Sequence, residues 1–254
     1  MALIRLDHLP ETTKVTQPLT ILLPDPGGMN GKPVRERKVL YLLHGLSDDG
    51  TAWQRFSSIE IVAREYGLVV VMPSVGRSFY ADLPNGQNYF TYLLEELPQY
   101  LSDVFDLSPR REDTLIAGLS MGGYGAFKAA FLHPERFAAA GSFSGFLSME
   151  FIKAYPEDPR FAEFSTTMGD LHHLAGSVHD PETWIRTLSE KKVDPPKLYM
   201  SCGTDDDLLP LNRLFLSQCQ AAGIQPTYRE EEGAKHEWTF WDREIRVFLK
   251  QVLG

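Results

Sequence analysis

The run from residue 114 to residue 123 reads Thr-Leu-Ile-Ala-Gly-Leu-Ser-Met-Gly-Gly, and it decides the fold. Thr114–Ala117 is typical of a buried strand, and Met121–Leu132 is typical of a helix of small residues. Between them, Gly118-Leu-Ser120-Met-Gly122 has the G-x-S-x-G spacing of a sharp strand-to-helix turn, which crowds its neighbours and exposes the serine hydroxyl at a helix N-terminus. The similar string Gly141-Ser-Phe-Ser-Gly145 has a phenylalanine at its centre and is set aside.

Apolar and amphipathic runs alternate on both sides of this turn. The apolar runs predict further strands at 39–43, 68–72, 137–143, 197–201 and 226–230. The amphipathic runs predict helices at 57–66, at 89–105 with a break or kink at Pro98, and at 182–191, 210–222 and 238–252. This alternation predicts an α/β fold, with a mostly parallel central sheet and helices on both faces. We expect one domain over residues 1–254, with an irregular cap-like insertion near the active site at about 146–196, where the pattern loosens.

The composition excludes several function classes. The 254 residues carry 25 Lys and Arg against 34 Asp and Glu, a net charge of −9, which argues against nucleic-acid binding. No uncharged apolar stretch reaches the roughly 20 residues of a spanning helix, and the N-terminus lacks a signal-peptide core. We therefore expect a cytoplasmic protein without a membrane partner. His172, His173 and His179 have no second cluster of ligands beside them, so neither a metal nor a cofactor is expected.

A serine hydroxyl is a weak nucleophile unless a base removes its proton and an acid orients that base. For this turn the expected chain order is serine, then Asp or Glu, then histidine. His236 follows the last predicted strand, in a loop before the final helix, and is the favoured base. The acid is expected within Asp205-Asp206-Asp207, which follows the strand at 197–201, but spacing does not choose among these three carboxylates.

Two further features of the site are expected from neighbouring segments. The loop His44-Gly-Leu-Ser47 follows the strand at 39–43, and one of its backbone N–H groups is expected to point toward Ser120. The N–H of Met121 is the second expected donor of this oxyanion hole. Trp53, Phe79, Tyr80 and the segment 146–196 are candidates for the wall of the substrate pocket.

This constellation resembles the esterase D branch of the α/β-hydrolases, and more closely the bacterial tributyrin esterase-like group. The resemblance covers nearly the whole chain and rests on residues 42–46, 70–73, 78–82, 95–98, 117–125, 142–145, 202–206 and 236–238. It implies the α/β-hydrolase fold and a serine carboxylesterase that hydrolyses short-chain acyl esters through an acyl-enzyme intermediate. It also implies that Asp206 is the acid and His236 the base, and that Leu46 and Met121 supply the oxyanion N–H groups.

One departure from the family pattern bears on the substrate. The S-formylglutathione hydrolases of this branch typically have Thr-Cys after the oxyanion leucine, where this chain has Ser47-Asp48. An S-formylglutathione hydrolase-like thioesterase and a carbohydrate acetyl or feruloyl esterase are the alternative enzymes. A non-catalytic binding protein on the same fold would usually lack a triad member. The expected partner is a small-molecule ester, and a homo-oligomer is compatible with the sequence.

Overall fold

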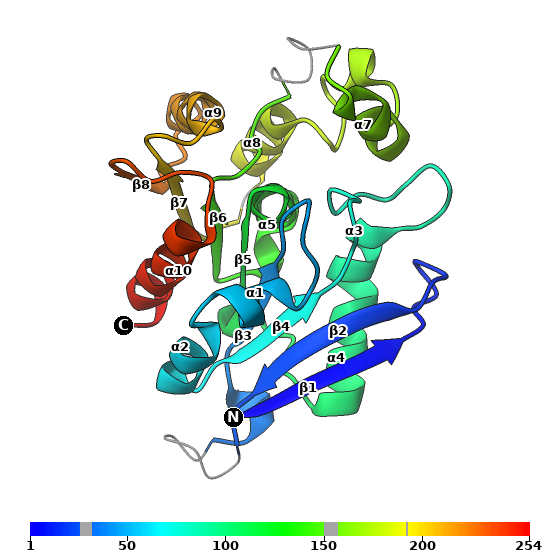
Figure 1. Cartoon of the computed structure of the whole chain (residues 1–254), viewed down its shortest axis with the longest axis vertical. Coiled ribbons are helices and arrows are strands. Elements are labelled where there is room, and N and C mark those ends of the chain that lie inside the picture. The colour runs from blue at the N-terminus through cyan, green and yellow to red at the C-terminus, as the bar shows by residue number, and fades with distance from the viewer. Residues whose placement is uncertain (26–31, 150–156, 192) are drawn as a thin grey trace.

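The computed structural model describes residues 1–25, 32–149, 157–191 and 193–254. The described strands form one eight-stranded sheet in the order β1-β2-β4-β3-β5-β6-β7-β8 (Figure 1). Their bounds are β1 Ala2–His8, β2 Gln17–Leu23, β3 Val39–Leu43, β4 Val69–Pro73, β5 Thr114–Leu119, β6 Ala139–Phe143, β7 Lys197–Gly203 and β8 Thr227–Glu231. Only β2 runs against its neighbours, and all pairs from β4 to β8 are parallel. The predicted mostly parallel sheet is confirmed.

Helices cover both faces of the sheet, because the strand side chains alternate between two apolar cores. In β3, Val39, Tyr41 and Leu43 face one core, while Leu40 and Leu42 face the other. The second core is closed by α1 Ala52–Phe56, α2 Ile59–Tyr66 and α10 Trp238–Leu253. The first core is closed by α3 Tyr89–Thr91, the π-helical η2 Tyr92–Glu96, α4 Leu97–Phe105, α5 Met121–Leu132, α8 Pro181–Glu190 and α9 Leu209–Ala221.

Two expectations about the elements need correction. Strands β1 and β2 were not predicted, and the helix expected at 57–66 is α2, which begins at Ile59 and follows the separate α1. The helix expected at 89–105 with a break or kink at Pro98 is divided into α3, the π-helical η2 and α4, which begins at Leu97. Short 3-10 turns complete the described elements: η1 Val34–Glu36, η3 Arg111–Asp113, η4 Pro134–Arg136 and η5 Leu171–His173.

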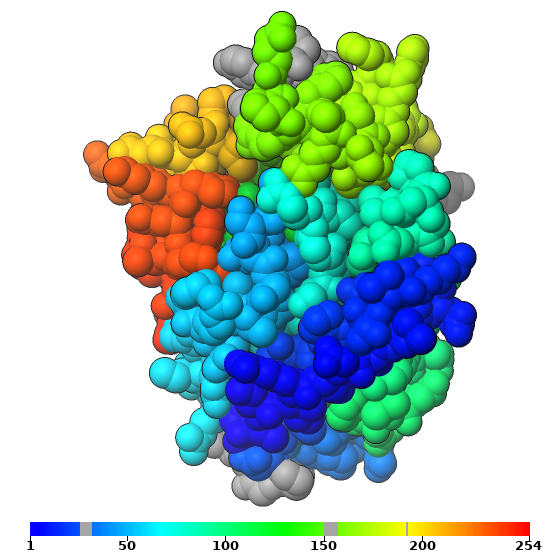
Figure 2. All heavy atoms as spheres, turned by 45° about the vertical axis from the view of Figure 1, so that its right-hand side comes forward, coloured from blue at the N-terminus to red at the C-terminus, as the bar shows by residue number. Residues whose placement is uncertain are grey.

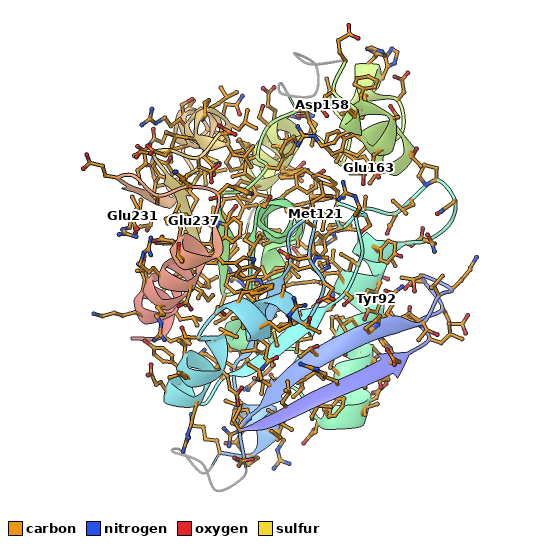
Figure 3. All side chains as sticks on the ribbon, in the orientation of Figure 1. Tyr92, Met121, Asp158, Glu163, Glu231 and Glu237 are labelled. Carbon is orange, nitrogen blue, oxygen red and sulfur yellow. The ribbon has the colours of Figure 1, made fainter. Side chains whose placement is uncertain are left out.

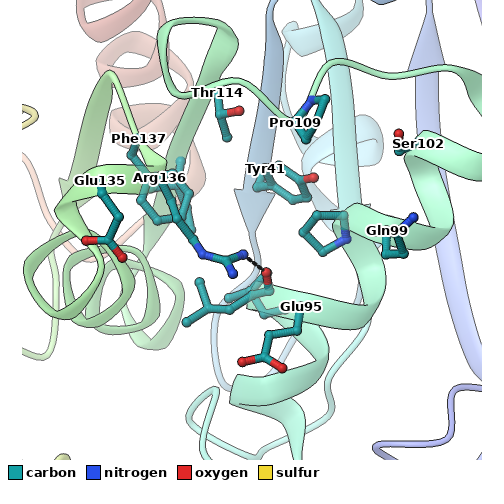
Figure 4. Close-up of a pocket in the computed structure, with 13 residues that line it drawn as sticks. Tyr41, Glu95, Gln99, Ser102, Pro109, Thr114, Glu135, Arg136 and Phe137 are labelled. Atoms are coloured by element: carbon teal, nitrogen blue, oxygen red, sulfur yellow. Dashed lines mark hydrogen bonds between the residues drawn. The ribbon is translucent and has the colours of Figure 1, made fainter.

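Pro98 has a local consequence beside a cavity that the predicted site residues do not line. Proline has no N–H, so the carbonyl of Leu94, four residues earlier, lacks its usual helical donor. The guanidinium of Arg136 donates to that carbonyl instead, at the wall of a cavity of about 500 Å³ (Figure 4). None of the residues predicted for the active site lines this cavity. Arg136 stabilises the helix there by bonding to the Leu94 carbonyl.

The segment between β6 and β7 contains a helix that was not predicted, α7 Arg160–Met168, in addition to the predicted α8. Residues 150–156 and 192 of the expected insertion lie outside the described residues. Figure 2 shows the described part, green to yellow, at the upper end of the molecule. No helix among the described residues is both long enough and apolar enough to cross a membrane.

Candidate active site

Ser120 occupies a strained turn between β5 and α5. Its backbone has φ 53° and ψ −117°, which is a costly conformation for a residue with a side chain. A Cβ on Gly118 would lie 2.4 Å from the Gly122 backbone, so the residues two before and two after the serine must be glycine. The Ser120 N–H donates to the carbonyl of Phe143 on the neighbouring strand β6 at 2.9 Å. The surrounding sheet thus supports the strained serine.

His236 and Asp206 meet at the carboxyl edge of the same sheet. The loop after β7 places Asp206, and the loop between β8 and α10 places His236. The Nδ1 of His236 donates to Asp206 Oδ2 at 2.9 Å, since an ionised carboxylate only accepts. This tautomer leaves the Nε2 of His236 as a hydrogen-bond acceptor. Asp205 and Asp207 are exposed, whereas the side chain of Asp206 is buried.

Asp206 is held as a carboxylate by further donors. Burial raises its pKa, but hydrogen bonds from His236, from the Ser144 hydroxyl and from the Leu208 N–H outweigh burial and leave the pKa below its ordinary value. The indole Nε1 of Trp241 donates to Ser144 Oγ at 3.2 Å. The Trp241 ring also stands edge-on to the His236 ring, with 4.9 Å between their centroids. Ser144 and Trp241 therefore orient both members of the pair.

One cavity of about 670 Å³ brings the predicted site residues together. Ser120, Asp206 and His236 line it, and so do Leu46 and Met121, whose N–H groups were predicted as donors. Met121 is the first residue of α5, so its N–H has no acceptor within the helix. Three phenylalanines in mutual ring contact, Phe79, Phe146 and Phe164, form one part of its apolar wall, and Leu208, Pro210 and Leu211 form another.

Two expected pocket residues lie elsewhere, which corrects the sequence analysis. Trp53 is buried beneath the loop after β3, where its Nε1 donates to the Leu43 carbonyl at 2.9 Å. Tyr80 is also buried, and its hydroxyl donates to the His44 carbonyl at 3.0 Å. Neither residue lines the cavity, because each supports the loop from behind.

Three residues of the site's surroundings were missed by sequence reasoning. Ser144 belongs to the string at 141–145 that was set aside, although its position just after β6, beside the strand of Ser120, was a usable signal. Trp241 sits in the first turn of α10 and Phe164 in α7, and no sequence pattern links either to Ser120. Figure 3 shows Glu163 of α7 above and to the right of Met121, toward the upper end of the molecule.

The chain matches a family model described as "Putative esterase" over residues 11–251. An acetyl esterase of Caldicellulosiruptor saccharolyticus is 33% identical over 243 residues, which cover 93% of this chain and 91% of that protein. The fluorophosphonate-binding serine hydrolase F of Staphylococcus aureus, solved with substrate bound, superposes with a TM-score of 0.89 at 32% identity, covering 100% of this chain and 98% of that one.

A second solved structure, the S-formylglutathione hydrolase of Staphylococcus aureus, has a TM-score of 0.88 and 32% identity, covering 100% of this chain and 99% of that one. These likenesses confirm the resemblance to the esterase D branch, and the tributyrin esterase-like subgroup stays a prediction. The strained Ser120 and the hydrogen-bonded Asp206–His236 pair line the same cavity of this chain. The chain belongs to the Esterase family, and it is a serine esterase with the α/β-hydrolase fold of the esterase D type.

Proposed function

We propose that Ser120 is the nucleophile, His236 its general base and Asp206 the acid that orients the base. One observation carries this assignment: the buried Asp206 accepts the Nδ1–H of His236 at 2.9 Å on the wall of the cavity that also contains the strained Ser120. The Nε2 of His236 is then the nitrogen that receives the serine proton. Among the three adjacent aspartates, only the middle one is both buried and bonded to the histidine.

The chemistry follows from these positions. Ser120 Oγ attacks the ester carbonyl carbon while His236 takes the hydroxyl proton, and the carbonyl oxygen becomes an oxyanion. The protonated His236 returns this proton to the departing alcohol, which leaves an acyl group on Ser120. Water then attacks the acyl-enzyme with His236 again as base, and the carboxylic acid is released. Asp206 stays ionised throughout and stabilises the imidazolium.

The oxyanion is proposed to lie between two backbone donors, the N–H of Leu46 and the N–H of Met121. Both residues line the cavity beside Ser120, and Met121 opens helix α5. A helix N-terminus favours negative charge, so α5 adds to the stabilisation of the transition state.

The substrate we propose is an ester with a short acyl group, such as an acetyl or butyryl ester. The acetyl esterase relative supports this proposal, and so does the cavity wall, where the rings of three phenylalanines pack against one another beside Ser120. A glutathione thioester is the second candidate, because one solved neighbour at 32% identity is an S-formylglutathione hydrolase. The cytoplasmic location and the single-domain organisation stay predictions from the sequence.

The test combines covalent labelling with a serine substitution. A fluorophosphonate should label Ser120, and Ser120→Ala should abolish labelling and lower kcat by about 10⁴-fold or more. Ser217→Ala, which changes a serine on α9, is the control and should keep full activity. Rates on p-nitrophenyl acetate and butyrate, measured beside S-formylglutathione, separate the ester from the thioester. Labelling at another serine would refute the assignment.

A further inference from the structure

The side chain of His44, which the proposed reaction does not use, has a fixed partner on each ring nitrogen. His44 is fully buried at the end of β3, and burial lowers its pKa, so the ring is neutral. Its Nε2 accepts the backbone N–H of Val75 at 3.1 Å. The proton of the neutral ring is therefore on Nδ1, which donates to the carbonyl of Gly45 at 2.8 Å.

This carbonyl belongs to the same peptide unit as the N–H of Leu46. A peptide unit is planar and trans, so its C=O and N–H point in opposite directions. A hydrogen bond that fixes the Gly45 carbonyl thus also fixes the direction of the Leu46 N–H. The Asp48 N–H donates to the same carbonyl at 3.2 Å, and the Asp48 carboxylate accepts the Gly45 N–H.

The fixed peptide lies directly beside the nucleophile. A Cβ on Gly45 would be 3.7 Å from the Cβ of Ser120 and 2.6 Å from Cδ1 of Leu119, so the loop packs closely against the turn at this point. The hydroxyl of Tyr80 donates to the His44 carbonyl at 3.0 Å and supports the loop from below. The side chains of His44, Asp48 and Tyr80 therefore all hold the backbone of this loop in place.

We propose that His44 is a positioning residue, which aims the Leu46 N–H at the oxyanion through the carbonyl of Gly45. This inference rests on the proposed function, because it needs Leu46 to be an oxyanion donor. Hydrogen bonds to a carbonyl also polarise the N–H of the same peptide, which strengthens it as a donor. An interaction of this kind acts on the transition state more than on the bound ester, so it raises kcat and leaves KM nearly unchanged.

Two substitutions at position 44 each remove the hydrogen bond of one ring nitrogen and keep that of the other. In His44→Asn the side-chain amide ends near the place of Nδ1, so it keeps a donor for Gly45 and loses the acceptor for Val75. In His44→Gln the amide ends near the place of Nε2, so it keeps an acceptor for Val75 and loses the donor for Gly45. Glutamine also fills the buried space better than asparagine does, and we expect it to be the more stable variant.

We expect the more stable variant, His44→Gln, to be the slower enzyme, and the less stable variant, His44→Asn, to be the faster one. With p-nitrophenyl butyrate, His44→Gln should lower kcat by about 10- to 100-fold with little change in KM, less than the about 10²- to 10³-fold loss of a whole oxyanion donor. His44→Asn should stay within about fivefold of the wild type in kcat, although it unfolds at lower urea concentration. A merely structural role would make the less stable variant the slower one.

Two outcomes would overturn the proposal: His44→Asn as slow as or slower than His44→Gln, or equal kcat in both variants and the wild type. Ser120→Ala, assayed in parallel, shows whether the role of His44 alone is wrong or whether the proposed function is wrong as well. If Ser120→Ala is inactive and position 44 shows no inversion, only the role of His44 is refuted. If Ser120→Ala retains activity, the proposed function fails, and the positioning role fails with it.

Discussion

Arg77 and Glu163 connect the loop after β4 to helix α7 through two hydrogen bonds, of which Nη2 to Oε2 measures 2.7 Å. The same guanidinium donates from Nη1 to the carbonyl of Leu46 at 3.3 Å. One side chain therefore links the helix that carries Phe164 to the loop that carries the proposed oxyanion donor. The two side chains are 47% and 30% exposed, so the ion pair contributes little to global stability and more to the shape of the cavity.

Glu163→Gln should loosen α7 without unfolding the protein. We expect the free energy of unfolding to fall by less than about 1 kcal/mol, as for other exposed ion pairs. Because Phe164 lines the cavity, the ratio of kcat/KM for octanoyl to butyryl esters should rise by about fourfold for each further methylene that becomes buried. Urea unfolding and a panel of p-nitrophenyl esters measure the two quantities.

The matched control is Glu230→Gln. Glu230 forms an equivalent two-point ion pair with Arg213, at 2.8 and 2.7 Å, and neither residue lines the cavity. This variant should leave the chain-length ratio unchanged. An unchanged ratio in Glu163→Gln as well would show that the pair does not set the position of α7 over the cavity.

Asp206→Asn should lower kcat by about 10⁴-fold, because an amide in place of the carboxylate favours the wrong histidine tautomer. Asp205→Asn and Asp207→Asn should each change kcat by less than about tenfold, since both side chains are exposed and neither bonds to His236. The three variants have the same charge change at adjacent positions, so each controls for the others. Similar losses in all three would mean that the loop as a whole, and not one carboxylate, had been disturbed.

The sequence predicted the strands from β3 to β8. Strand β3 is a continuous apolar run, helix α5 consists mostly of small and apolar residues, and the bounds of both were predicted within a few residues. Strand β2 escaped prediction although most of its residues are buried. Strand β1 escaped prediction because it is an edge strand with Arg5 and Asp7 among its apolar residues, so its pattern is weak. Helix α7 escaped because it is short and charged at its start.

The site was predictable where local geometry dictates residue type. A turn that places Gly118 against Gly122 requires glycines at fixed offsets, so Ser120 was recognisable from the sequence. The choice of Asp206 needed a family resemblance, because burial among three adjacent aspartates depends on how the loop after β7 packs. The pocket wall was predictable only in part: Phe79 and Tyr80 are neighbours in the sequence and both were candidates, yet only Phe79 lines the cavity.

Lys128 should make stability depend on pH in a measurable way. It is buried in α5, donates to the Tyr80 carbonyl at 3.3 Å and lies 4.3 Å from the centre of the Phe90 ring. Burial lowers its pKa to about 7, from 10.5 in an unfolded chain. Between these two pH values the unfolded chain binds a proton that the folded chain does not, so the contribution of Lys128 to the free energy of unfolding rises with pH.

Lys128→Met removes this titration. We expect the variant to be more stable than the wild type at pH 7, and its advantage should shrink by about 2 kcal/mol by pH 9. Urea unfolding at several pH values measures the difference between the two proteins, in which the titration of buried tyrosines and cysteines cancels. Lys250→Met, at an exposed position of α10, should show a constant difference. A constant difference for Lys128→Met too would contradict the prediction.

The last prediction concerns acyl length. Each methylene that finds apolar surface gains about 0.8 kcal/mol, or about fourfold in kcat/KM. The rings of Phe79, Phe146 and Phe164 pack against one another at centroid distances of 5.2 to 6.0 Å, and together they form one apolar side of the cavity. We expect kcat/KM to be highest for acetyl to butyryl esters and to drop sharply by octanoyl. Phe164→Ala should move the optimum toward longer chains, because it removes a ring from α7 without touching Ser120 or His236. A wild-type profile that rises steadily to decanoyl esters would mean that an apolar groove continues past these rings.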